Sequence, residues 1–288
     1  MRMKERKQNK KIFFIFELVF WAAALSFLGI NISKMLIEEW NNITAIYILG
    51  VILIVMFVHT IKALRLYIIL FGNNFNLEEY LEVYVKTAAV NLLLPFKCGE
   101  IYRGLCVGGL IGGYAEGYIV VIFDRFVDTL ALITIVAGAG VLSGFEITFT
   151  YLLLACFLLL VIAIYCLFMP LYEYWNHFLI FKKKSEHTLR GLQFLSICKS
   201  TFIHINEMVK GRFIILYLLS LAAWGVEVGY FLLLTNVANE MAISTYLSDV
   251  LAGTLNANNA IYMIVCLVVF LICGGVLASV KIFEKVRK

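Results

Sequence analysis

The densest group of polar residues in this otherwise apolar chain lies between positions 91 and 103. Its members that could bind a charged group or shape such a site are Asn91, Pro95, Lys97, Gly99, Glu100 and Arg103. Pro95 ends or kinks a helix, and Gly99 permits a turn. Glu100 and Arg103 are three positions apart, so on a following helix they share a face and can pair. Ionisable groups at membrane depth are costly and indicate a functional site by default, whereas the alternative is a cytoplasmic loop with solvated charges.

A second group of charged residues, Asp124, Arg125 and Asp128, lies near the start of the next long apolar run. Asp124 and Asp128 share a helical face, and Arg125 can reach Asp128. The group is either an internal ion pair that locks helices together or the wall of a polar cavity. Glu227 lies in the middle of a later apolar run. A carboxylate there has to be protonated or paired with a cation such as Arg103 or Arg125.

No pattern in the sequence indicates a catalytic nucleophile, a metal ion or any other cofactor. The seven cysteines have no metal-ligand spacing, and their positions in apolar runs favour buried small side chains over disulfides. The segment Gly109-x-x-x-Gly113-x-x-x-Gly117 favours close helix packing and permits a homodimer. A phosphate-binding loop is disfavoured because no strand precedes these glycines and no Gly-Lys-Ser/Thr follows them.

The composition around these groups is unlike that of a water-soluble protein. Of 288 residues, 62% are hydrophobic and 15% are charged, and the mean hydropathy is +0.93. Soluble domains are typically about half apolar and a quarter charged. The sequence therefore predicts an all-α, polytopic bundle of membrane helices. Its longest segment without a strongly apolar run, 170–212, is short for a soluble catalytic domain, so residues 1–288 are predicted to form one transmembrane domain.

Six apolar runs are long enough to cross a bilayer. They are 12–32, 43–68, 117–140, 149–169, 213–235 and 261–280. Two shorter apolar stretches, 80–96 and 243–258, are candidates for re-entrant segments. The second contains Gly253, Asn256 and Asn258 and is followed by Asn259, and an extracellular loop is an equal alternative for it. Two broken segments that enter from opposite faces are typical of transporters built from inverted repeats.

The distribution of Lys and Arg predicts the topology, because cytoplasmic loops are enriched in both. The basic segment 1–11 places the N-terminus in the cytoplasm. If 80–96 enters the membrane and returns, then the basic loop 170–212 and the C-terminus also lie inside. A full crossing by 80–96 would force the loop outside, so charge favours a re-entrant hairpin. His59, Lys62 and Arg65 then mark the cytoplasmic end of the second span.

Part of the basic loop has helical periodicity. Apolar residues recur at intervals of three and four between Leu189 and Val209, with Arg190 and Lys199 off this stripe. The pattern predicts an amphipathic helix on the inner leaflet. Together with Lys182 to Lys184 it would attract anionic headgroups. The alternative is an ordinary positive-inside loop with no specific lipid role.

At these residues the chain resembles the membrane region of the lysylphosphatidylglycerol synthases, a flippase-like family that also occurs as stand-alone membrane proteins. The resemblance covers most of residues 10–235, and its most specific part is Asn91-x-x-x-Pro95-x-x-x-Gly99-Glu100-x-x-Arg103. The weaker matches are Ala63 to Arg65, Arg125, Asp128, Trp224 and Glu227. The chain departs from the family pattern at Lys97, usually Arg, and at Asp124, often Glu. It also lacks a Pro-Gly-Gly-rich second motif at 251–259.

The resemblance implies lipid translocation rather than lipid synthesis, because this chain has no room for the soluble aminoacyl-transferase domain of full-length relatives. We expect a protein of the cell membrane that moves phosphatidylglycerol or lysyl-phosphatidylglycerol between leaflets. Lys97, Arg103 and Arg125 would bind the phosphate, and Glu100, Asp128 and Glu227 would balance those charges or receive a cationic headgroup. The alternatives are an accessory subunit for a separate envelope lipid or glycan enzyme, and a phosphatidylglycerol lysyltransferase. Nucleic acid is not an expected partner, because the basic residues lie beside apolar spans.

Overall fold

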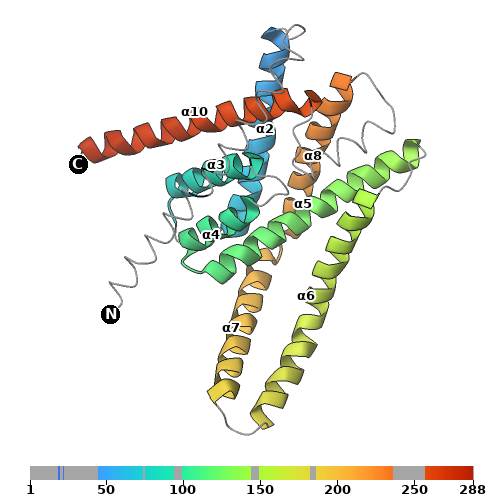
Figure 1. Cartoon of the computed structure of the whole chain (residues 1–288), viewed down its shortest axis with the longest axis vertical. Coiled ribbons are helices and arrows are strands. Elements are labelled where there is room, and N and C mark those ends of the chain that lie inside the picture. Colours follow the sequence, from blue (N-terminus) through green and yellow to red (C-terminus); the bar gives the residue numbers. More distant parts are fainter. Residues whose placement is uncertain are drawn as a thin grey trace.

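The computed structural model describes residues 19, 22, 45–73, 75–93, 99–143, 149–181, 186–235 and 257–287. In these ranges every secondary-structure element longer than a turn or an isolated bridge is an α-helix, which confirms the predicted all-α class (Figure 1). The helices are α2 (Ala45–Leu70), α3 (Leu77–Leu93), α4 (Gly99–Ile111), α5 (Tyr114–Ser143), α6 (Phe149–Phe181), α7 (Glu186–Val209), α8 (Phe213–Thr235) and α10 (Ala257–Arg287).

Three segments of the described helices are long and apolar enough to cross a membrane. These are Ile48–Leu70 in α2, Leu152–Phe181 in α6 and Phe213–Tyr230 in α8, and α10 contains the shorter apolar segment Ile264–Leu277. Five of the six predicted spans overlap α2, α5, α6, α8 and α10. The sixth, 12–32, lies outside the described residues apart from positions 19 and 22, as does 243–258 apart from its last two positions. The count of six spans and the second re-entrant segment therefore stay predictions.

Helices α3 and α4 lie side by side and occupy the position of the predicted re-entrant hairpin (Figure 1). Helix α3 ends at Leu93, two residues before Pro95, as expected for a residue that cannot continue a helix. Gly99 begins α4 against the end of α3, where an added Cβ would lie 2.4 Å from the Cα atom of Asn91. Glycine at this position is therefore what allows the polar ends of the two helices to meet.

The predicted close packing of glycine-rich helices occurs, but only Gly117 of the predicted motif takes part, and its partner is Gly108. Helix α4 ends at Ile111, and Gly112 adopts a φ of +83° in the turn before α5, so Gly109, Gly113 and Gly117 do not share one helix. The close approach is instead between α4 and α5, where a Cβ on Gly117 would lie 2.3 Å from the backbone nitrogen of Gly108. Because the chain turns at Gly112, the glycines on either side of the turn lie on two adjacent helices that pack against each other.

Helices α6 and α7 form a hairpin that projects away from the other helices (Figure 1). Helix α6 continues through Pro170 to Phe181, so the predicted loop begins about twelve residues later than expected. Apolar helices tolerate such a proline where neighbouring structure supports them. Here α7 packs along α6, with Phe168 and Phe202 stacked at 4.4 Å between ring centroids. Helix α7 covers the segment predicted to be an amphipathic helix, and its location on the inner leaflet stays a prediction.

The main apolar core lies where α2, α3, α4, α5 and α8 meet. Buried side chains from all five helices contribute, including Leu66, Tyr80, Val107, Val121 and Leu216. Helix α10 packs against α2 and α3 through a second cluster that contains Cys266 and Phe270. These contacts fix α2, α4, α5 and α8 around the charged residues described next.

Candidate functional site

Arg65 of α2 is the centre of a buried charged network. Its side chain is 1% exposed. The Nε atom donates a hydrogen bond of 2.8 Å to Asp124 Oδ1, and one terminal nitrogen donates to Asp128 Oδ1 and, at 2.7 Å, to Ser220 Oγ. Asp124 and Asp128 belong to α5 and Ser220 belongs to α8. A single guanidinium group therefore joins three helices.

Arg125 binds the other oxygen atoms of the same two aspartates. Its terminal nitrogens lie 2.9 Å from Asp124 Oδ2 and 3.3 Å from Asp128 Oδ2. The second of these contacts is the predicted ion pair between residues three apart on α5. The arrangement supports the reading as an ion pair that locks helices together, because the two aspartates also bind Arg65 of α2, whereas the reading as the wall of a polar cavity stays a prediction. The planar guanidinium fork makes such shared contacts possible, which a lysine could not reproduce.

Arg103 and Glu100 of α4 extend the network toward α3. Arg103 lies 3.5 Å from Asp124 Oδ2 and 3.7 Å from Glu100 Oε2, and Arg125 lies 3.4 Å from Glu100 Oε1. Asn91 of α3 donates a hydrogen bond of 2.9 Å to Glu100 Oε1. The contacts of Glu100 with the two arginines are longer than those of Asp124 with Arg65 and Arg125. Glu100 is therefore the carboxylate that the cations hold least tightly.

The network is balanced in charge, with Arg65, Arg103 and Arg125 facing Glu100, Asp124 and Asp128. Balance is necessary because a buried charge without a partner costs several kcal/mol. The two aspartates are nearly inaccessible, whereas the side chains of Glu100 and Arg125 are 16% and 20% exposed. The network therefore has one closed side around Arg65 and one more open side around Glu100 and Arg125.

Several polar atoms on the open side have no hydrogen-bond partner among the described residues. They are Asn91 Oδ1, Glu100 Oε2, Arg103 Nε and Arg125 Nε, and on the closed side one terminal nitrogen of Arg65 also has no such partner. Buried donors and acceptors are normally satisfied, so each exception calls for a physical reason. Arg103 Nε has free donor capacity, and Arg125 Nε lies 3.4 Å from Glu100 Oε1 without a hydrogen bond to it. Two such N–H groups beside a loosely held carboxylate form an arrangement that can accept an anionic group.

Glu227 belongs to a neighbouring ion pair rather than to the arginine network. Its Oε2 atom lies 2.7 Å from Lys62 Nζ, so the predicted pairing with a cation is confirmed, although this cation is Lys62 and not one of the two examples named, Arg103 and Arg125. Lys62 and Arg65 both make contacts across the interface between α2 and α8, and their placement at the cytoplasmic end of the span stays a prediction. His59, one turn earlier, makes a 3.3 Å contact with the hydroxyl of Tyr84.

The structure thus brings together most of the residues predicted from the sequence. Asn91, Glu100, Arg103, Asp124, Arg125 and Asp128 form one network, with Gly99 at the junction of α3 and α4. Pro95 and Lys97 lie outside the described residues. The sequence reading missed Arg65, Lys62 and Ser220 as members of the site. The sequence feature that could have indicated Lys62 and Arg65 is their spacing: His59, Lys62 and Arg65 follow one another at intervals of three, which places them on one face of an apolar helix.

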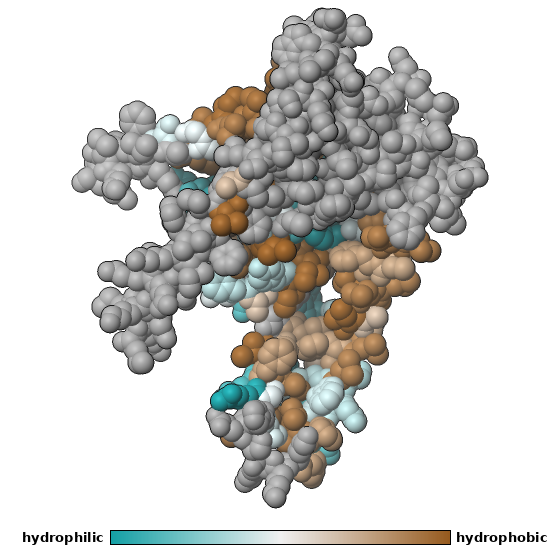
Figure 2. Space-filling model, in the orientation of Figure 1, coloured by the Kyte–Doolittle hydropathy of each residue, from teal (hydrophilic) through white to brown (hydrophobic). Residues whose placement is uncertain are grey.

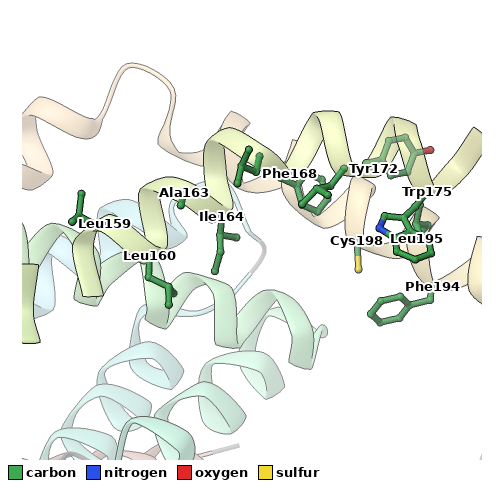
Figure 3. Close-up of a pocket in the computed structure, with 12 residues that line it drawn as sticks. Leu159, Leu160, Ala163, Ile164, Phe168, Tyr172, Trp175, Phe194, Leu195 and Cys198 are labelled. Carbon is green, nitrogen blue, oxygen red and sulfur yellow. The ribbon is translucent and has the colours of Figure 1, made fainter. Parts of the chain in front are cut away.

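A groove of about 680 Å³ lies apart from the network, between α6 and α7. Figure 3 shows Leu160, Ile164 and Phe168 of α6 along it and Phe194 and Leu195 of α7 on the other wall. Apolar side chains also dominate the visible face of the hairpin in Figure 2. Such a surface matches a hydrocarbon environment, as expected of a helix with so many exposed large apolar residues.

Comparison with known proteins gives one match. The family described as lysylphosphatidylglycerol synthase TM region matches residues 12–275, which include every helix of the charged network. No curated protein and no solved structure matches the chain significantly.

Proposed function

Because the chain belongs to the transmembrane family of the lysylphosphatidylglycerol synthases, we propose that it moves phosphatidylglycerol or its lysyl form between the leaflets of the cytoplasmic membrane. The proposal concerns translocation and not synthesis of the lipid. The observation that supports it most is the open side of the arginine network, where Arg103 and Arg125 keep free donor capacity inside a helical bundle.

The phosphate of a phospholipid is the anion that best fits this side of the network. Guanidinium groups bind phosphate through paired N–H donors, and Arg103 and Arg125 each have an Nε–H group without a hydrogen-bond partner among the described residues. Binding requires Glu100 to loosen its contacts at 3.4 and 3.7 Å, since a carboxylate repels phosphate. Asp124 and Asp128 stay bound to Arg65, so the closed side of the network keeps its charge balance.

Such an exchange would lower the cost of carrying a charged headgroup through the bilayer. An isolated phosphate in hydrocarbon has no compensating charge, whereas here two cations would replace its water. Helices α3 and α4 meet at this position, so movement of one against the other would open or close the site. The driving force would come from the lipid gradient or from an ion gradient.

A transport assay with site variants tests this proposal. The chain is reconstituted into liposomes, and fluorescent phosphatidylglycerol and lysyl-phosphatidylglycerol are followed from one leaflet to the other. We expect Arg103→Ala and Arg125→Ala to lower the rate at least about tenfold, the effect of losing about 1.4 kcal/mol of binding in the rate-limiting state. The matched control is Arg190→Ala on the exposed surface of α7. Equal rates for wild type, Arg103→Ala and Arg125→Ala would refute the assignment of the site.

A further inference from the structure

The groove between α6 and α7 has a polar end and an apolar end. Tyr172 and Trp175 of α6 lie at the polar end, beside Leu195 and Cys198 of α7 (Figure 3). From there the apolar lining follows α6 as far as Leu159. A ligand that matches the whole groove therefore has a long apolar part and a polar group at one end of it.

The apolar part of the groove is about as long as one leaflet of a bilayer is thick. Leu160 and Tyr172 are twelve positions apart in one helix, so they are separated by about 18 Å along its axis. Half of the hydrocarbon core of a bilayer measures about 15 Å. Leu160 and Ile164 are 58% and 60% exposed, so a hydrocarbon chain can lie directly against them. The groove can therefore hold one acyl chain of a lipid along its length.

A lysine lies at the polar end of the groove. Lys199 of α7 places its Nζ atom 4.8 Å from the centroid of the Tyr172 ring. It pairs with no carboxylate among the residues that the structure describes, so its N–H donors remain available to an anion. The acidic residue next to Tyr172, Glu173, lines a separate hollow with Tyr174 and His177. The polar end of the groove therefore carries a positive charge.

The sequence of α6 indicates how the groove lies in a membrane. Positions 152–164 contain only apolar residues, whereas positions 172–177 read Tyr-Glu-Tyr-Trp-Asn-His. Tyr and Trp are enriched where a membrane meets water. The polar end of the groove is thus expected at the membrane surface and its apolar end in hydrocarbon. In the predicted topology this surface faces the cytoplasm, where the leaflet carries anionic lipids.

We propose that the groove binds one anionic phospholipid of the inner leaflet, with an acyl chain along α6 and the phosphate at Lys199. A lysine binds phosphate as a point charge. A zwitterionic lipid presents the same phosphate with a cation of its own beside it, so Lys199 favours the anionic lipid. The site is separate from the arginine network, and its lipid stays bound to the α6–α7 hairpin while other lipids are moved. The inference therefore does not depend on the proposed function.

Trp175 reports whether a lipid occupies the groove, because it lines the groove and is 48% exposed. Lipids with brominated acyl chains quench the fluorescence of a tryptophan that they contact. The full chain is reconstituted into phosphatidylcholine vesicles in which a small share of either phosphatidylglycerol or phosphatidylcholine is brominated. The signal of Trp175 is the difference between the wild type and Trp175→Phe, since the chain contains 4 tryptophans. We expect phosphatidylglycerol to bind about fivefold more tightly, equivalent to about 1 kcal/mol for one basic residue.

Two variants of α7 test the role of the lysine. Lys199→Gln should lower the ratio of the two affinities to about one, whereas Arg190→Gln, which removes the same charge outside the groove, should leave it at about fivefold. Equal quenching of the wild type by both lipids would indicate an unselective lipid layer and overturn the inference. An equal loss in both variants would assign the preference to the basic surface as a whole and also overturn it.

Absence of quenching by either lipid would mean that water or another molecule fills the groove, which would equally overturn the inference. None of these results depends on transport by the arginine network, so the proposed function stands or fails separately.

Discussion

Removal of the central arginine is the sharpest perturbation of the charged network. Arg65 donates to Asp124 at 2.8 Å, to Ser220 at 2.7 Å and also to Asp128, and it is 1% exposed. In Arg65→Met, two arginines would face three buried carboxylates. One negative charge would be left without compensation, and Ser220 would lose a hydrogen-bond donor.

The expected cost follows from the burial of these groups. Removal of one partner from a buried ion pair typically destabilises a protein by about 3–5 kcal/mol. Arg125 and Arg103 remain near the aspartates at 2.9 to 3.5 Å, so the lower half of this range applies. Arg65→Lys should cost less, because it keeps the charge, but a single ammonium cannot reproduce the planar fork that reaches α5 and α8.

A compensating substitution separates charge balance from packing. Asp128→Asn in the Arg65→Met background restores equal numbers of charges, so the double variant should be more stable than the sum of the single variants by at least about 1 kcal/mol. The assay is reversible unfolding in detergent micelles or bilayer discs, with Arg190→Met as the control for loss of an exposed arginine. Destabilisation by less than about 1 kcal/mol, or no rescue by Asp128→Asn, would refute the reasoning.

Three other predictions concern packing, capping and topology. Gly117→Ala should destabilise the fold by about 1–3 kcal/mol because its Cβ would lie 2.3 Å from the α4 backbone. Gly109→Ala, with no atom within 4 Å, is its matched control in the same unfolding assay. Arg212→Ala should lower thermal stability by about 1 kcal/mol, because Arg212 donates hydrogen bonds of 3.1 and 2.9 Å to two carbonyl oxygens at the end of α2. A cysteine introduced at Ser185, in a background without other cysteines, should react with a membrane-impermeant label only from the cytoplasmic side. Labelling from outside in intact cells would contradict the re-entrant topology.

The helical class and most of the charged residues follow from sequence because each rests on a local signal. Long apolar runs require helices in a membrane, and the spacing of Arg125 and Asp128 places the two on one face of α5. The fold-back between α3 and α4 is likewise local, because α3 ends at Leu93, two residues before a proline in the sequence, and Gly99 permits the close start of α4. These parts depend on interactions within about ten residues.

The partners across helices could not be predicted in the same way. Arg65 and Asp124 are 59 positions apart, and Lys62 and Glu227 are 165 positions apart. Such pairs depend on which faces of α2, α5 and α8 meet, and several basic residues were available to Glu227. The general preference of basic residues for the cytoplasmic interface predicts a position along the membrane for Lys62 and Arg65, but it does not predict which carboxylates they bind. The glycine contact also differs from the predicted one, because the chain turns at Gly112 in the middle of the repeat and Gly117 packs against Gly108 of the preceding helix.

The central claim is that the open side of the arginine network carries a phospholipid headgroup across the membrane. Its most direct test is the fraction of fluorescent phosphatidylglycerol or lysyl-phosphatidylglycerol that a membrane-impermeant quencher reaches in liposomes containing the chain. We predict that wild-type protein makes nearly all of at least one lipid accessible over time, whereas Arg103→Ala stays near the half seen in protein-free vesicles. Liposomes with folded wild-type protein that never exceed this half, or an Arg103→Ala variant that matches the wild type, would contradict the account.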